Sequence, residues 1–104
     1  MPLIAFNHFN IRAPASLLTT VRDFYVDVIG LVEGPRPDAP VAGYWLYLAD
    51  VPVLHLMEWS DGPQSPDLER GYLDHIAFSC HDEMAFIDRF EQLAVPFQRR
   101  EFTL

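Results

Sequence analysis

The sequence predicts an α+β fold of paired βαβββ modules, in which the second module is incomplete and consists of a strand, a helix and a strand. Two repeated features predict this architecture. The stretch NHFNIRA (7–13) returns in altered form as DHIAFSC (74–80), and in both a polar residue and a histidine precede an alternating, strand-like pattern. A segment with helical spacing follows each stretch, so the halves repeat with an offset of about 67 residues.

The first module is expected at residues 1–59. Alternation predicts a strand from Leu3 to Arg12, and a stripe of apolar residues at helical spacing predicts a helix over 15–30 that stops at a glycine. A short strand over 31–34 runs into a loop rich in proline, and two strands at 44–48 and 51–59 are joined by a tight turn.

The second module is expected to be shorter. Residues 60–71 have the polar, turn-forming composition of a linker, and the partial module occupies 72–104. Within it we expect a strand over 72–80, a helix over 84–93 with Asp82 as its N-cap, and the beginning of a strand after residue 95. With 104 residues, half of them hydrophobic, the two modules together should make one domain.

The charge balance argues against several partners and mechanisms. Fifteen acidic and seven basic residues give a net charge of -8, and all the basic residues are arginines scattered along the chain. A nucleic-acid phosphate backbone requires clustered positive charge, so nucleic acid is not an expected partner. The absence of lysine from the sequence excludes a Schiff-base mechanism in this chain.

The sequence also predicts a soluble, cytoplasmic protein. The longest unbroken apolar run is 44–49, which is far shorter than a membrane span, and the first residues lack the pattern of a signal peptide. The single cysteine, Cys80, cannot form a disulfide within the chain.

Three of the four histidines are candidate metal ligands. Taken singly, a histidine is more often a structural or surface residue than a ligand. His8 and His75, however, lie at equivalent positions of the repeat, on the strand face opposite the bulky apolar residues, and His55 occupies an interior face of the last strand of the first module. Three neutral imidazoles converging on one space would bind a divalent transition metal well. His81, at a strand-to-helix junction, is expected to cap the helix or meet solvent.

Three further residues are candidates for contact with a small-molecule substrate. Arg12 shares the strand parity of His8, and Trp45 and Tyr47 share one face of the strand 44–48. The two aromatic residues either line a pocket for an organic ligand or fill the core, and we favour the core because aromatic side chains dominate protein cores.

The sequence resembles the vicinal oxygen chelate superfamily, which includes glyoxalase I, extradiol dioxygenases and bleomycin-binding proteins. The matching stretches cover most of the chain: FNHFNIRAP, VRDFYVDVIGLVEGPRP, GYWLYLADVPVLHLME and YLDHIAFSC. The resemblance implies two βαβββ modules around an open cavity with a divalent metal ion (Fe, Zn, Ni or Mn), and a dioxygenase-like or lyase-like enzyme that chelates vicinal oxygens of its substrate. It places three of the family's ligand positions on His8, His55 and His75.

The chain departs from the family pattern in two ways. The family's fourth ligand, a glutamate on the last strand of the second module, has no counterpart before Leu104, so we expect a homodimer whose partner completes the module, or a truncated inactive homologue. Glyoxalase I has a carboxylate where this chain has His55, which weakens that assignment; in a dioxygenase-like site His8 and His75 would be the two histidine ligands, and His55 would be able to act as an acid or base. The alternative function is a binding module without catalysis, which sequesters an aromatic ligand as the bleomycin-binding relatives do.

Overall fold

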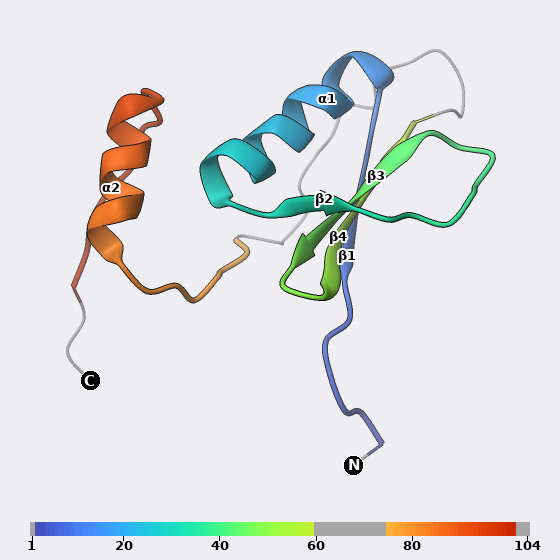
Figure 1. The fold of residues 1–104 in the computed structure, drawn as a ribbon, viewed down its shortest axis with the longest axis horizontal. Coiled ribbons are helices and arrows are strands. Elements are labelled where there is room, and N and C mark those ends of the chain that lie inside the picture. Colours follow the sequence, from blue (N-terminus) through green and yellow to red (C-terminus); the bar gives the residue numbers. More distant parts are fainter. Residues whose placement is uncertain (1, 60–74, 102–104) are drawn as a thin grey trace. The chain divides into compact units, whose positions relative to one another are not determined.

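The computed structural model describes residues 2–59 and 75–101 and divides the chain into two compact units, Met1–Leu68 and Glu69–Leu104. The first unit contains all the strands that the structure describes: β1 (Phe9–Ala13), β2 (Val32–Gly34), β3 (Gly43–Leu48) and β4 (Val51–Glu58). They form one mixed sheet in the order β1-β4-β3-β2, in which β1 is parallel to β4 and the other neighbours are antiparallel (Figure 1). The α+β class is therefore confirmed.

The helix expected over 15–30 is confirmed, with a change of helix type along its length. Helix α1 (Ala15–Asp23) starts after Pro14, whose fixed φ suits a helix start, and continues as a π-helix, η1 (Phe24–Ile29). Gly30 ends it with a φ of 99°, a left-handed conformation that glycine adopts without steric penalty, and its amide donates to the carbonyl of Tyr25 at 3.0 Å.

The apolar core of the first unit lies between the helix and one face of the sheet. Leu46 on β3 and Leu54 and Leu56 on β4 are fully buried there, in contact with Leu18 of α1 and Leu31 after the helix. These strand positions share one parity, so every second side chain on the two central strands points at the helix. Burial of this face is what holds α1 and η1 against the sheet.

Strand β1 is shorter than expected. The alternating pattern begins at Leu3, but the ladder with β4 begins with Phe9 opposite Leu54, and Leu3, Ile4 and Phe6 are exposed. Extending the register would place Phe6 opposite Val51, the first residue of β4. Residues 3–5 therefore have no neighbouring strand to bond with, and alternation alone does not make a strand.

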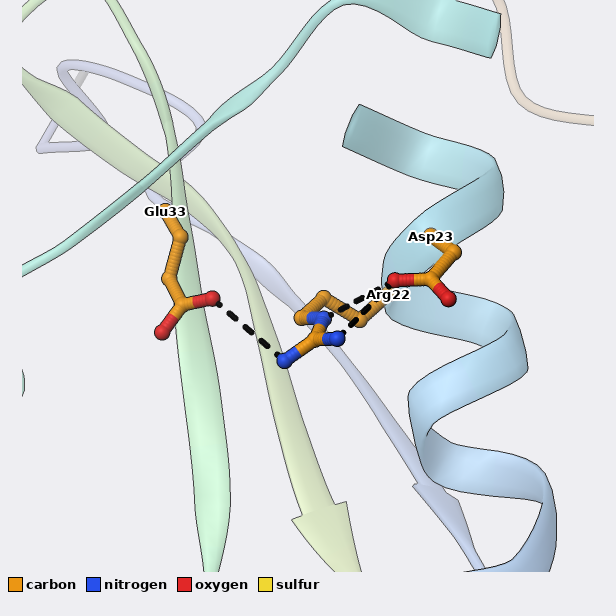
Figure 2. A network of polar contacts seen from close by, with 3 residues as sticks. All are labelled: Arg22, Asp23 and Glu33. Carbon is orange, nitrogen blue, oxygen red and sulfur yellow. Dashed lines mark hydrogen bonds and ion pairs between the residues drawn. The ribbon is translucent and has the colours of Figure 1, made fainter. Parts of the chain in front are cut away.

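A polar network ties the helix to the edge strand β2. Figure 2 shows Arg22 of α1 between Asp23 and Glu33, with Nη2 at 3.0 Å from the Asp23 carboxylate and Nη1 at 3.7 Å from that of Glu33. The same guanidinium lies over the ring of Tyr44 on β3 at 4.7 Å from its centroid. Exposed ion pairs contribute little each, about 0–1 kcal/mol, so this network orients the edge strand more than it stabilises it.

The described part of the second unit contains one helix, α2 (Glu83–Gln92), as expected. The Asp82 side chain caps it by accepting from the amide of Ala85 at 3.3 Å. Ring contacts join Phe86 to Phe90 and Phe90 to Phe97, with centroids 6.1 and 5.3 Å apart.

The prediction of strands on either side of α2 is wrong for the residues that the structure describes. Residues 75–80 and 95–101 contain no strand, whereas 72–74 and 102–104 lie outside the described part. Ile76 and Phe78 carry the apolar half of the alternation and are exposed. A strand requires a neighbour whose backbone completes its hydrogen bonds, and the described part of this unit offers none.

Candidate functional site

One face of the four-stranded sheet is turned away from α1 and carries most of the predicted site residues. Register places Asn10 of β1, His55 of β4 and Trp45 of β3 in one row across three strands, so their side chains project from the same face. This is the parity opposite to that of the buried leucines. We call it the histidine face, and its members on the strands include Asn10, Arg12, Val32, Gly34, Gly43, Trp45, Tyr47, His55 and Met57.

Three rings stack across this face. The ring of His55 lies between those of Trp45 and His8, with centroids 4.0 and 3.7 Å away and interplanar angles of 8° and 15°. His8 precedes β1 by one residue, and the parallel pairing of β1 with β4 brings it beside His55. Two of the three predicted ligands are therefore neighbours, and the imidazole of His55 is covered on both flat sides.

Hydrogen bonds define which ring nitrogens are available. The amide oxygen of Asn7 lies 2.7 Å from Nδ1 of His8, and because that oxygen can only accept, Nδ1 carries the proton. His55 also hydrogen-bonds to the backbone of Pro52, and since proline has no N–H, the imidazole must donate to its carbonyl. In a neutral imidazole whose Nδ1 donates in this way, Nε2 keeps its lone pair, which is the form in which histidine binds a metal ion.

His55 Nε2 is the most unusual atom of the site. The His55 side chain as a whole is partly exposed, yet its Nε2 atom is buried and has no hydrogen-bond partner among the described residues. Buried polar atoms normally have a partner, because leaving one unsatisfied costs about 1–3 kcal/mol. An atom of this kind at a predicted ligand position fits a metal ion or another bound group.

Burial lowers the pKa of His55, because the charged imidazolium loses solvation. The neighbouring imidazole of His8 lowers it further, the hydrogen bond to the Pro52 backbone opposes the change, and the positive charge of Arg36 adds to the lowering. His55 is therefore neutral at pH 7 and able to act as a ligand or as a proton acceptor.

Arg36 was not predicted as a site residue, yet its side chain lies on the histidine face. It follows β2 by two residues, and its Nη2 atom lies 3.1 Å from the place that a Cβ on Gly43 would occupy. Nη2 donates to the carbonyl of Val41 at 2.6 Å. The sequence signal was its parity: counted on from Gly34, which pairs with Trp45, Arg36 falls opposite Gly43.

Asn7 was also missed, although it stands next to His8 in the sequence. Its role as the acceptor for Nδ1 depends on the backbone conformation before β1, which the sequence does not specify.

The predicted substrate-contacting residues lie on the histidine face. Trp45 and Tyr47 do not belong to the core, so the favoured interpretation of them as core residues is wrong; the core takes Tyr44 and Leu46 of the same strand instead. Parity explains the difference, because alternate residues of β3 face the helix. Arg12 lies over the ring of Trp59, at 5.1 Å from its centroid.

His75 belongs to the second unit, where it is exposed. His81 is exposed as well, and the cap of α2 is the neighbouring Asp82. Over residues 2–59 and 75–101, no group of three or more His, Cys, Asp or Glu side chains is gathered as a metal site. The described arrangement is therefore a pair of imidazoles, His8 and His55.

No family model, curated protein or solved structure matches this chain. Among the described helices, none has the length and apolar character needed to cross a membrane.

Proposed function

We propose that this chain is a metal-dependent enzyme of the vicinal oxygen chelate superfamily, which binds two adjacent oxygens of a small molecule and acts as a dioxygenase or lyase. The observation that carries the proposal is the Nε2 atom of His55, which is buried, stacked beside His8 and without a hydrogen-bond partner among the described residues. Such an atom is destabilising until something binds it, and a divalent transition metal ion accepts an imidazole lone pair readily.

His8 and His55 would hold the ion through Nε2. Asn7 and the Pro52 carbonyl would act as the outer hydrogen-bond partners that orient metal-binding histidines and raise their basicity. His75 is the third proposed ligand, and its assignment rests on the sequence repeat alone. The proposed ion is Fe, Zn, Ni or Mn, and the proposal includes the paired-module fold, the homodimer and the cytoplasmic location.

The chain's own residues would perform most of the work. A bound divalent ion supplies Lewis acidity, which draws electron density from the substrate oxygens. Trp45 and Tyr47 would contact the organic part of the substrate, and Arg12 would add a positive charge on the same face. His55 is neutral at pH 7 because of its lowered pKa, so it would bind the metal ion without first having to lose a proton.

A second candidate is a binding module without catalysis, and the partial exposure of Trp45 and Tyr47 favours it. On the sheet face away from the core, these rings offer a flat apolar surface for an aromatic ligand. In that case the stack of Trp45, His55 and His8 would bind the ligand directly, and metal would not be required.

Metal analysis of protein purified without a histidine tag distinguishes the two candidates. The enzyme proposal expects about one transition-metal ion per chain, consistent with a single mononuclear site. A His55→Ala variant should lose it, and so should His8→Ala, because each change removes one of a small number of ligands. His81→Ala is the matched control, since it removes an exposed imidazole outside the proposed set.

Cobalt(II) substitution provides a second readout, because its visible spectrum reports imidazole ligation directly. A folded protein that takes up no metal would overturn the enzyme proposal and leave the binding module. Equal metal content in the His55→Ala and His81→Ala variants would remove His55 from the ligand set.

A further inference from the structure

We propose that Arg36 is a carboxylate-binding residue of the histidine face, and that the molecule bound there carries one negative charge beside the part that meets Trp45 and His55. This inference deepens the proposed function and rests on it only for the statement that the bound molecule is a substrate.

The position of the guanidinium is built into the fold. Arg36 projects across Gly43, where the missing side chain makes room for it, since a Cβ there would approach Nη2 to 3.1 Å. The Val41 carbonyl holds Nη2, and the Tyr47 hydroxyl donates to the carbonyl of Pro35, the residue before Arg36. The start of the loop between β2 and β3 is therefore tied down, and the charge is held in one place.

Its partners distinguish Arg36 from the two arginines that form ion pairs in the described part of the chain, Arg22 and Arg99. Arg22 and Arg99 each contact two carboxylates, and both are surface pairs. Within the described part of the chain, Arg36 forms no ion pair, and its hydrogen bond to the Val41 carbonyl uses one of five N–H donors. A partly buried cation without a carboxylate is unusual in a chain that has 15 acidic and seven basic residues.

The charge lies close to the ring stack. Gly43, beneath Arg36, and Trp45, stacked on His55, are two residues apart on β3 and share a face. A molecule lying against Trp45 and His55 would therefore bring a substituent within reach of Arg36.

A carboxylate fits this environment better than a more highly charged anion. The guanidinium is one fixed positive charge with parallel N–H donors, which match the two oxygens of a carboxylate. The net charge of -8 repels anions from the molecule as a whole, so a second negative charge would lack compensation.

Benzoate and benzamide are the probes that test this inference, because they share size and shape and differ in charge. Binding is measured on metal-free protein by ¹H–¹⁵N NMR titration, following the Trp45 indole and the backbone amides of the residues other than proline in 36–47. The wild type should bind benzoate at least about tenfold more tightly than benzamide. Arg36→Gln should abolish this preference, whereas Arg36→Lys, which keeps the charge but not the fork, should retain part of it.

The control is Arg100→Gln, which makes the same charge change at an exposed arginine in the second unit and should leave the preference unchanged. Equal binding of the two probes by the wild type would overturn the inference without any variant, as would equal losses in Arg36→Gln and Arg100→Gln. Because the titration uses no metal, it is independent of the test of the proposed function. A preference for benzoate in a protein that takes up no metal would leave Arg36 as a carboxylate-binding residue and remove only the enzyme proposal.

Discussion

Replacing Gly43 by alanine tests the close approach of β3 to β4 beneath the site. A glycine-to-alanine change in a strand would ordinarily stabilise the folded state by about 0.4–1 kcal/mol, because it reduces the freedom of the unfolded chain. Here the new Cβ would stand 2.0 Å from the backbone oxygen of Leu56, whereas ordinary contacts begin at 3.4 Å. The two atoms must therefore separate by about 1.4 Å, the difference of those distances.

The strand that must move is β4, and displacing it is costly. Leu56 is fully buried on β4, which lies between β1 and β3, so a shift of its backbone disturbs two ladders and the core. Overpacking of this kind costs about 1–3 kcal/mol, and the rigid obstacle puts the change at the upper end. We expect a net loss of about 2 kcal/mol in the free energy of unfolding, equivalent to a fall in Tm of about 8–16 °C.

Tryptophan fluorescence in a urea titration measures this loss for the first unit, because both tryptophans, Trp45 and Trp59, belong to it. Gly34→Ala is the matched control. Its Cβ would meet the ring of Tyr47 at 2.7 Å, and a side chain can swing aside at the expense of one hydrogen bond, so the loss should be smaller. A Gly43→Ala protein as stable as the wild type, or more stable, would refute the close approach of Gly43 to Leu56.

Three further predictions concern the core, the site and the second unit. Leu54→Ala should lower the free energy of unfolding by about 2–5 kcal/mol, because it opens a cavity in a fully buried position, whereas Leu48→Ala at an exposed position of β3 should change it by less than about 1 kcal/mol; urea titration of both variants compares them. The pKa of His55, followed by NMR of the metal-free protein, should lie below the ordinary 6.5 and rise in His8→Ala. Since the unfolded chain then binds more protons at this site, the contribution of His55 to stability should be complete above pH 6.5 and decline as the pH falls toward the lowered pKa. Urea titrations at several pH values should show a steeper loss of stability on acidification in the wild type than in His55→Gln, and equal pH dependence in the two proteins would contradict the prediction. Asp82→Ala should reduce the helix signal in circular dichroism, because the cap is worth about 0.5–2 kcal/mol and Asp82 adopts a φ of 61°, while Asp82→Asn should keep both the cap and the left-handed conformation.

Local patterns were sufficient to predict most of the first unit. Helical spacing followed by Gly30 predicted the helix and its end, because a stripe of apolar residues and a left-handed glycine are both properties of neighbouring residues. Alternation placed β3 and β4 within a residue of their observed ends for the same reason. Alternation also placed His8 on the side of its segment opposite Phe9 and Ile11, and His55 on the face of its strand opposite Leu54 and Leu56.

The predictions from the sequence were wrong where the outcome depends on residues that are distant in the sequence. Residues 3–5 and 75–80 carry strand-like alternation, but a strand exists only beside another strand, and whether one is present is a property of the fold. Trp45 could belong to either face of β3 until the position of α1 decided which face became the core.

The chemistry of the site divides in the same way. The sequence by itself determined that histidines occur at repeated, alternating positions, and so pointed to His8 and His55. Only the tertiary structure decided that parallel pairing of β1 with β4 stacks the two rings, that the amide oxygen of Asn7 lies against Nδ1 of His8, and that Arg36 crosses Gly43. The ring stack and the local charge depend on groups brought together from separate strands, and that is the information a linear pattern does not contain.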